Sequence, residues 1–398
     1  ELKELIDTFK RYLYLEKNTE QAIELMMAVA VSNKLPDDPI WMFFVAPPGS
    51  TKTEILRAFM EHPEAIFLSN LTTAAFGSGM KTKKEDPSLA SIVDGKILVI
   101  KDFTTILSLR PEIRDEILNI MRELYDGYYS KGFGIKGLQK WKPHFTCMAG
   151  VTYEIDKAHK VQTALGERFL RFRIHYEDQD ALIDQAQKIS AQEIEMRKEF
   201  QGAVQSFMDS HQLKFSDLPT ISEEFLKRIK KLARFLAWGR TSVSRDRYTH
   251  AIDYTPVPEA GTRLVKQFTK LIRCLGYVGG KKEIDEEDYA IIQKIATDGI
   301  PTKTYNTMKL LYDETEIYPQ TTERLGDQAD TDTRSMHAIL DDLKVLKIVE
   351  KTEKDDIREN RGRDDKWRMT NKFRAVIDES SLNHLPKPQP PIEEEIPF

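Results

Sequence analysis

The stretch IWMFFVAPPGSTKTEILRAFM, residues 40–60, decides the predicted fold. It opens with a continuous apolar run, typical of a buried strand, and it closes with residues spaced as on a helix. The glycine-containing loop between them ends in Lys52 and Thr53. In nucleotide-binding loops of this layout, main-chain N–H groups surround the phosphates, a lysine reaches the outer phosphates and a hydroxyl holds Mg²⁺. The stretch therefore predicts a strand, a phosphate-binding loop and a helix, with ATP and Mg²⁺ as ligands.

This loop departs from the usual pattern GxxxxGK[ST], because Ala46 and Thr51 stand where the outer two glycines belong. A β-branched residue forced to a positive φ is strained by roughly 1–3 kcal/mol. The alternative is a turn that matches the pattern by chance. We predict a nucleotide site nonetheless, made by Pro48, Gly49, Ser50, Thr51, Lys52, Thr53 and Glu54.

The composition is that of a globular protein of two or three domains, with 398 residues, 40% of them hydrophobic and 31% charged. No apolar run reaches the roughly 18 residues of a membrane span, and no secretory pattern opens the chain, so we expect a cytoplasmic protein without a membrane partner. The two cysteines, Cys147 and Cys274, lie in apolar patterns and are expected to be reduced core residues. A net charge of −5 neither implies nor excludes a nucleic-acid partner. The start at Glu1 leaves open that a DNA-binding or primase-like region precedes it.

Residues 1–175 are predicted to form the nucleotide-binding α/β domain. Residues 1–34 have helical periodicity, interrupted at the sequence KNTE, and a second amphipathic helix is expected at 111–125. Further buried strands are expected at 65–71, 96–103 and 144–152. Strands and helices that alternate at this spacing predict a parallel sheet with helices on both faces.

Three more parts are predicted after this domain. Residues 176–300 are almost wholly helical, apart from a hairpin or loop at 241–258. Residues 301–377 have the pattern of three helices followed by a charged hairpin, which is the layout of a winged helix-turn-helix. Residues 378–398 are rich in proline and acidic residues and are expected to be a disordered tail.

Four short motifs stand in the order used by AAA+ ATPases: APPGSTKT, ILVIKDF, CMAGVT and ALGERFLRF. The chain resembles the branch that contains the minichromosome-maintenance helicases and the helicase-like ATPases of phages and mobile elements. The resemblance covers roughly residues 20–300, and the winged helix continues it to 375. It implies an AAA+ domain in which the helices of 176–300 form a lid.

The resemblance also assigns roles near the phosphates. The family places two acidic residues after the strand of ILVIKDF, one for Mg²⁺ and one for the attacking water, whereas this sequence has Lys101 and Asp102. Asp102 is therefore expected to bind the metal with Thr53, to polarise the water, or both; the alternative is a strand-end cap. Thr152 resembles the family's sensor 1.

Two arginines complete the implied catalytic set. Arg168 resembles the arginine finger that reaches the γ-phosphate of a neighbouring subunit, which implies a homo-oligomer, expected to be a hexameric ring. Arg171 and Arg173 alternate with apolar residues as in a strand, and either remains open as a surface residue instead. Arg263 resembles sensor 2, and its alternative is a solvated arginine at a helix end.

The segment between 126 and 144 predicts a lysine-bearing hairpin, with GIKG as its turn. In the helicases that it resembles, a hairpin here enters the ring channel and grips the DNA backbone. Lys131, Lys136 and Lys140 are the predicted DNA-binding residues, with Lys136 at the turn; a solvated surface hairpin is the alternative. Residues 77–88 are a second lysine-bearing insertion, either facing the channel or a disordered loop.

The chain ends in IEEEIPF, which resembles the acidic tip of bacterial single-stranded-DNA-binding proteins. Ile396, Pro397 and Phe398 are accordingly predicted to recruit replication proteins, through an apolar anchor and a terminal carboxylate. A short acidic tail also arises readily by chance.

These observations favour a hexameric ATP-driven DNA translocase or helicase that serves the replication of a phage or mobile element. The first alternative is an initiator or helicase loader that binds DNA without processive unwinding. The second is a transcription-regulating ATPase. The altered phosphate loop and the single acid at 102 favour a slow switch, whereas the hairpin lysines favour translocation.

Overall fold

A computed structural model describes residues 1–77, 88–133, 137–157, 168–246, 248–249, 251–313, 319–352 and 365–382. The chain divides into two compact units. The first consists of Glu1–Ser222 and Lys266–Ile295, and the second of Glu223–Val265 and Ala296–Phe398. The helices between 176 and 300 are divided between the two units, and the domain boundaries expected at 175, 300 and 377 stay predictions.

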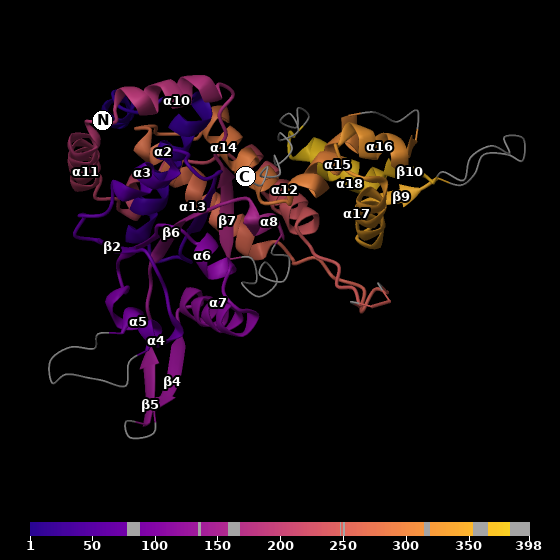
Figure 1. Cartoon of the computed structure of the whole chain (residues 1–398), viewed down its shortest axis with the longest axis horizontal. Helices are drawn as coiled ribbons and strands as arrows, with labels where there is room; N and C mark the ends of the chain where they lie inside the picture. Colours follow the sequence, from indigo (N-terminus) through magenta and orange to yellow (C-terminus); the bar gives the residue numbers. More distant parts are fainter. Residues whose placement is uncertain are drawn as a thin grey trace, which may run out of the picture. The chain divides into compact units, whose positions relative to one another are not determined.

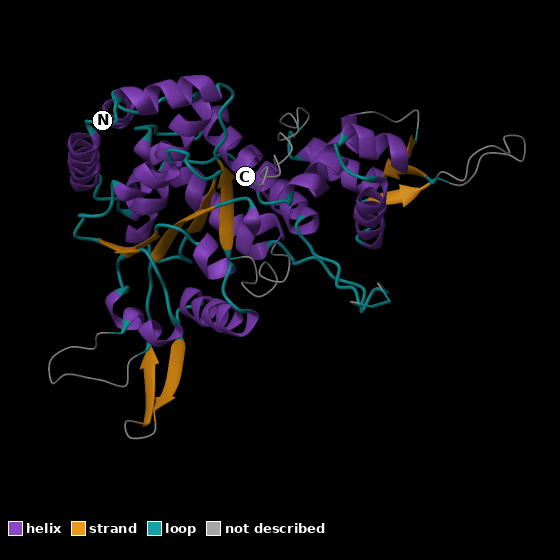
Figure 2. Cartoon of the chain, viewed as in Figure 1, coloured by secondary structure: helices purple, strands orange, loops and turns teal. Residues whose placement is uncertain are grey.

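The first unit is built on a five-stranded sheet, in the order β2-β3-β6-β1-β7, and all neighbouring strands are parallel (Figure 2). Its strands are β1 (Trp41–Val45), β2 (Ala65–Leu68), β3 (Ile97–Ile100), β6 (Thr146–Val151) and β7 (Phe169–Arg173). The parallel sheet expected from the sequence is thereby confirmed. Residues on β1 and β6 are buried on both faces, which explains their continuous apolar runs.

Helices cover both faces of this sheet (Figure 1). On one face, Trp41, Phe43 and Val45 share a core with the apolar side of the helix at 111–125. The helices whose residues lie in the first unit, wholly or in part, are α1 (Leu2–Lys10), α2 (Lys17–Val31), α3 (Lys52–Arg57), α4 (Thr73–Phe76), α5 (Leu89–Ile92), α6 (Thr104–Leu107), α7 (Pro111–Tyr125), α8 (Glu154–Lys157), α10 (Gln179–Lys188), α11 (Glu193–Ser210), α13 (Thr262–Val278) and α14 (Glu286–Asp298), with short 3-10 turns at Ser32–Lys34 and Phe215–Asp217. Cys147 and Cys274 are free and buried, as expected for core residues.

The break between the first two helices was wrongly placed at KNTE. It falls at residues 11–16, and KNTE forms the first turn of α2. The main-chain carbonyl of Glu16 accepts the N–H groups of Thr19 and Glu20, so the polar residues begin the helix rather than end one. None of the helices in the described ranges is both long and apolar enough to cross a membrane.

A two-stranded hairpin, β4 (Tyr129–Phe133) and β5 (Gly137–Trp141), follows α7 and extends away from the sheet in Figure 1. The rings of Tyr129 and Trp141 are buried and stack at its base, 5.3 Å apart. The predicted hairpin is therefore present. Its turn, residues 134–136, lies outside the described residues.

The second unit contains a small antiparallel sheet, in the order β8-β10-β9, together with several helices. These elements are α12 (Glu223–Gly239), α15 (Thr302–Asp313), β8 (Gln320–Thr321), α16 (Thr322–Gln328), α17 (Thr333–Val345), β9 (Val349–Lys351), β10 (Lys366–Met369) and α18 (Asn371–Glu379). The order of three helices and two strands follows the prediction. Residues 241–258 contain an antiparallel bridge between Arg245 and Ile252, in agreement with the hairpin alternative.

Residues 378 and 379 are not part of the disordered tail that the sequence had predicted. The helix α18 continues through Glu379, and Leu382 is only 2% exposed. The Thr370 side chain caps this helix, and the buried ring of Phe373 stacks on Trp238 of α12, so packing holds the segment in place. The predicted partner-binding residues Ile396, Pro397 and Phe398 lie outside the described residues.

Candidate nucleotide site

Three strand ends bring the predicted phosphate-site residues to one edge of the sheet. Because β1, β3 and β6 are parallel, their carboxyl ends meet there, with Val45 opposite Val151 and Ile100 opposite Ala149. The phosphate loop follows β1, Asp102 follows β3 and Thr152 follows β6. We refer to this edge as the carboxyl edge.

The loop backbone accommodates both departures from the glycine pattern. Gly49 has a φ of 75°, which only glycine adopts readily. Thr51 has a φ of −66° and a ψ of −8°, in the right-handed helical region. Ala46 is not among the residues of the described ranges that have a positive φ. The strain considered for Thr51 therefore does not occur.

Lys52 is the central charged group of the loop. Its side chain is 6% exposed, and its Nζ donates to the main-chain carbonyls of Ala46 at 3.1 Å and Val151 at 2.9 Å. Burial lowers the pKa of Lys52 to about 8, against the opposing attraction of Asp102. Among the described residues, these two carbonyls are the hydrogen-bond partners of Nζ. A buried cation that contacts only neutral carbonyls is suited to a phosphate, which would supply the missing negative charge.

This pKa leads to a test by pH. Lys52 loses its proton as the pH rises through about 8, and a neutral amine no longer attracts phosphates. We expect the affinity for an ATP analogue to be constant below pH 8 and to fall above it, by at most about tenfold per pH unit. The affinity should be measured from pH 6.5 to 9.5 for wild type and for Lys52→Met, in which the pH dependence due to the ammonium is absent. Parallel pH profiles for the two proteins would contradict the role of the ammonium.

Thr51 makes a contact that glycine at this position would lack. Its hydroxyl is hydrogen-bonded to the hydroxyl of Tyr176, three residues after β7, and Thr51 is 7% exposed. Burial raises the pKa of Tyr176, so this phenol stays neutral. The contact links the phosphate loop to the segment after the edge strand.

Thr51→Gly should therefore not improve the site, although it restores the usual pattern. We expect a loss of about 1 kcal/mol in the free energy of unfolding, because a hydrogen bond is lost and the unfolded chain gains freedom. Urea denaturation measures this change, and Thr51→Ser, which keeps the hydroxyl, is the control. A gain in stability with glycine would contradict the φ seen here.

Asp102 caps the chain at the end of β3, which was the alternative role considered for it. Its Oδ1 accepts the N–H of Thr104 at 2.9 Å. The cap occupies one oxygen, and the partly exposed carboxylate remains at the carboxyl edge. The structure thus places Asp102 where the nucleotide role needs it while also using it to start α6.

Thr104 is a site residue that the sequence analysis missed. Its hydroxyl accepts the N–H of Thr152 at 3.0 Å and donates to the Thr152 hydroxyl at 3.3 Å. It thereby fixes the side chain predicted as sensor 1. Two threonines 48 residues apart carry no pattern that points to such a contact.

Gly150 was also missed, although it shapes the space for Lys52. A Cβ added at Gly150 would lie 2.7 Å from the carbonyl oxygen of Lys101 and 3.3 Å from Cδ of Lys52. Only glycine lets β6 approach both neighbours this closely. The sequence signal was a glycine inside a buried strand, which often marks a close approach.

The remaining loop residues have separate environments. Pro48 is exposed, and Ser50 and Thr53 are half-buried; the Oγ of Ser50 is buried without a hydrogen-bond partner. The Glu54 carboxylate accepts two hydrogen bonds from Arg197 of α11, at 2.9 and 3.1 Å. Glu54 thus links α3 to α11.

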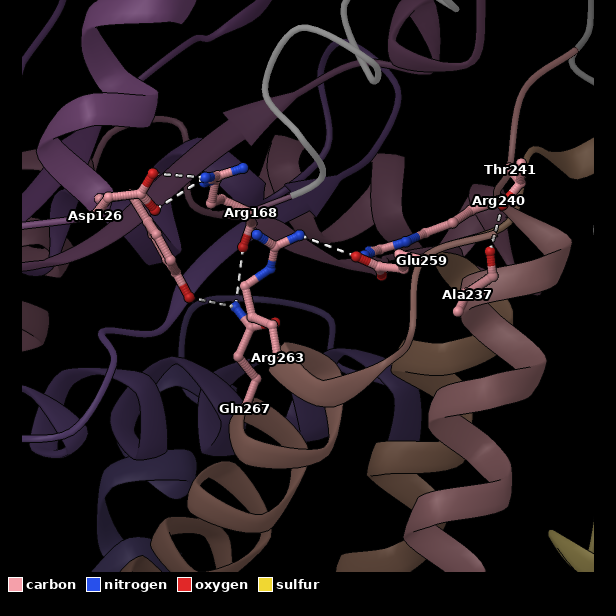
Figure 3. A network of polar contacts seen from close by, with 9 residues as sticks. Asp126, Arg168, Ala237, Arg240, Thr241, Glu259, Arg263 and Gln267 are labelled. Atoms are coloured by element: carbon pink, nitrogen blue, oxygen red, sulfur yellow. Dashed lines mark hydrogen bonds and ion pairs between the residues drawn. The ribbon is translucent and has the colours of Figure 1, made fainter. Parts of the chain in front are cut away.

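Arg168 lies at the opposite edge of the sheet. It directly precedes β7, whose first residue is opposite Trp41 at the start of β1. A five-residue strand separates the two edges by about 13 Å. Arg168 donates to both carboxylate oxygens of Asp126, at 2.9 and 2.7 Å (Figure 3). In its own chain it is therefore directed away from the phosphate loop.

Arg171 and Arg173 are not surface residues, so that alternative is wrong. Both are buried on β7, and both donate to Oδ1 of Asp156, at 3.3 and 2.8 Å. They alternate with Phe172 as in a strand, but α8 covers their face and supplies the aspartate. The alternation with apolar residues suggested a surface position, but packing of α8 buries both arginines.

Arg263 belongs to the second unit. Its Nη2 donates to Glu259 at 3.0 Å, and the same carboxylate is paired with Arg240, which is 4% exposed (Figure 3). Arg263 is 24% exposed on its side chain, so it is neither buried nor fully solvated. Its role as sensor 2 stays a prediction.

The hairpin places its two described lysines on opposite faces. Lys131 is paired with Gln139, and Lys140 with Ser130, and adjacent pairs on a hairpin alternate between faces. Lys140 is exposed and Lys131 half-buried. Gly77, the first residue of the insertion predicted at 77–88, lies beside Lys131: a Cβ added at Gly77 would be 3.5 Å from its Cδ, an ordinary van der Waals contact. Lys136 lies outside the described residues.

No protein-family model and no curated protein sequence matches this chain. In the part of the chain that the structure describes, no group of three or more His, Cys, Asp or Glu side chains is arranged to hold a metal ion. What the geometry defines is an α/β domain with a five-stranded parallel sheet between helices, consistent with a P-loop-like domain.

Proposed function

We propose that this chain is an AAA+ ATPase that forms a ring, hexameric by the resemblance alone, and uses ATP to move along or unwind DNA. The observation that supports nucleotide binding is the position of Lys52, a buried ammonium at the carboxyl edge whose hydrogen-bond partners among the described residues are two main-chain carbonyls. What distinguishes Lys52 is its place in the loop between β1 and α3, beside Gly49 with its φ of 75°, because the main-chain N–H groups of such a loop can surround a phosphate.

ATP with Mg²⁺ would supply the phosphoryl group and the charge that the site is built to receive. Lys52 would bind the outer phosphates, and the main-chain N–H groups from Gly49 to Thr53 would surround them. Thr53 and Asp102 would hold Mg²⁺, which commonly has one or two protein ligands, phosphate oxygens and water. Thr104 would orient Thr152 toward the same edge.

A shared active site follows from the position of Arg168. Its side chain is at the amino edge of the sheet and is paired with Asp126. An arginine there can act on a phosphate only if a second copy of the chain brings its own carboxyl edge to it. This geometry supports a homo-oligomer in which each chain completes its neighbour's site.

The DNA part of the proposal is supported by the hairpin β4–β5 and by the second unit. The hairpin extends from the first unit and carries the exposed Lys140. The helices α15, α16 and α17 and the strands β9 and β10 that follow them, with β8 between α15 and α16 completing the sheet, support a winged-helix domain. Such domains commonly place a helix in the DNA major groove.

A loader or initiator switch is the second candidate. It is favoured by the single acid after β3, since Asp102 also serves as a cap through Oδ1. One carboxylate that performs several tasks suits slow hydrolysis.

ATPase activity with and without single-stranded DNA, followed by strand displacement on a forked duplex, tests these functions. We expect DNA to stimulate the ATPase, and Lys136→Ala and Lys140→Ala to reduce this stimulation while nucleotide binding persists. Lys188→Ala, an exposed lysine at the end of α10, is the matched control. Stimulation without strand displacement would favour the loader, and hydrolysis indifferent to DNA would overturn both functions.

Mixing two inactive variants tests the shared site. Arg168→Ala subunits retain an intact phosphate loop, and Lys52→Ala subunits retain an intact Arg168. Mixed rings should therefore recover part of the activity, whereas no recovery at any ratio would argue for a site within one chain.

A further inference from the structure

Arg168 is held by several side-chain and main-chain contacts within the first unit. Its guanidinium is bonded to both oxygens of Asp126 and lies 5.6 Å from the centre of the Tyr125 ring. The Nε2 of Gln267 donates to the main-chain carbonyl of Arg168 and to the Tyr125 hydroxyl, both at 3.0 Å (Figure 3). Gln267 is 1% exposed, so this anchor on the Arg168 backbone is part of the core.

Asp126 has a second connection, to the hairpin. It is the residue at which α7 ends, and β4 begins three residues later at Tyr129. The short link between them is turned by Gly127, with a φ of 72°, and by a hydrogen bond from the Tyr128 N–H to the Glu123 carbonyl. Only Gly127 and Tyr128 thus separate the carboxylate that holds Arg168 from the base of the hairpin.

We propose that Asp126 is a positioning residue that couples the hairpin β4–β5 to Arg168. DNA held by the hairpin would shift Asp126 and with it the guanidinium that is presented to the neighbouring subunit. Gln267 keeps the main chain of Arg168 in place, so that the shift acts on the side chain. This inference rests on the proposed function and explains how DNA would stimulate hydrolysis at a site that it does not touch.

The ion pair between Asp126 and Arg168 is exposed enough for Asp126 to be replaced without unfolding the protein. The side chain of Asp126 is 52% exposed, while that of Arg168 is 12% exposed. Ion pairs with an exposed partner contribute little to folding, so Asp126→Asn should fold. It keeps the shape of the side chain and removes the charge that holds Arg168.

The experiment compares Asp126→Asn with wild type, with Asp126→Glu and with Asp115→Asn. Asp115 lies on the same helix, is 46% exposed and is paired with the adjacent Arg114, so it controls for the loss of one acid from α7. We measure the affinity for an ATP analogue and the ratio of ATPase rates with and without single-stranded DNA. Asp126→Asn should keep the affinity and lose at least about fivefold in the ratio, the lower end of usual coupling between sites. Asp126→Glu should restore most of the ratio, and Asp115→Asn should retain all of it.

The outcomes separate this inference from the proposed function. Wild-type protein without DNA stimulation would overturn the proposed function, and this inference with it. A stimulated wild type and an equally stimulated Asp126→Asn would overturn the inference alone. So would a loss that Asp126→Glu fails to restore, or one that Asp115→Asn shares, because either would indicate a structural role of the helix end.

Discussion

Lys52→Met is expected to abolish useful nucleotide binding while the protein stays folded. Hydrogen bonds to a charged group contribute about 1.5–3 kcal/mol each, so losing the contacts to phosphate should weaken binding by about 3 kcal/mol, roughly a hundredfold in Kd. A pKa of about 8 instead of 10.5 means that burial disfavours the charged side chain by about 3 kcal/mol. Methionine removes this cost. It also leaves the Ala46 carbonyl without its donor, at about 1–3 kcal/mol, so the two effects nearly cancel.

Lys270→Met is the matched control for this prediction. Lys270 is 7% exposed, and among the described residues its Nζ donates to the carbonyls of residues 35, 37 and 38, before β1 begins. It is thus a second buried ammonium on neutral carbonyls, but at the amino edge. Titration of a fluorescent ATP analogue should show normal affinity for Lys270→Met and a large loss for Lys52→Met. Equal affinities in the two variants would remove the basis of the nucleotide site.

Gly150→Ala is expected to have the largest effect on stability. The new Cβ would lie 2.7 Å from the Lys101 carbonyl oxygen, a main-chain atom that no rotamer change can move, and 3.2 Å from Cδ1 of Leu56. Overpacking of a core lowers the free energy of unfolding by about 1–3 kcal/mol, and a clash with the backbone should lower it by at least the upper value of this range. For a domain of this size, we expect the Tm to fall by about 10 °C. Because Cδ of Lys52 lies on the same side, nucleotide affinity should fall as well.

Gly202→Ala provides the comparison. Gly202 lies inside α11, and nothing lies within 4 Å of a Cβ built there. Alanine should raise the free energy of unfolding by about 0.5–1 kcal/mol, since glycine is unfavourable inside a helix. Thermal unfolding of the two variants shows whether the position or the added methyl group matters. A Gly150→Ala protein as stable as wild type would mean that β6 and β3 are farther apart than described.

Local patterns were sufficient for the elements that surround the phosphate loop. The apolar runs at 40–46, 96–103 and 144–152 each became a strand of the parallel sheet, and the helix expected at 111–125 is α7. Such runs are informative because a strand buried on both faces must be apolar throughout. The loop between β1 and α3 then brought Lys52 to the carboxyl edge without any further assumption.

Local patterns failed where a distant segment decides the environment. The sequence left open whether Thr51 is strained; its φ is −66° and its hydroxyl is hydrogen-bonded to Tyr176, 125 residues away. Arg171 and Arg173 alternate like surface residues but are buried against Asp156. The predicted tail included residues 378 and 379, which are the end of α18, because the core partner of this helix, α12, lies more than a hundred residues earlier.

The sequence by itself determined the α/β sheet, the position of the phosphate loop and the hairpin after α7, because hydrophobic periodicity and turn residues act over short distances. Only the tertiary structure decided that Thr104 and Gly150 shape the site, and that Arg168 is held by Asp126 and Gln267 at the opposite edge. Those contacts join residues that are tens of positions apart, and their distances depend on how strands and helices pack. No local pattern contains that information.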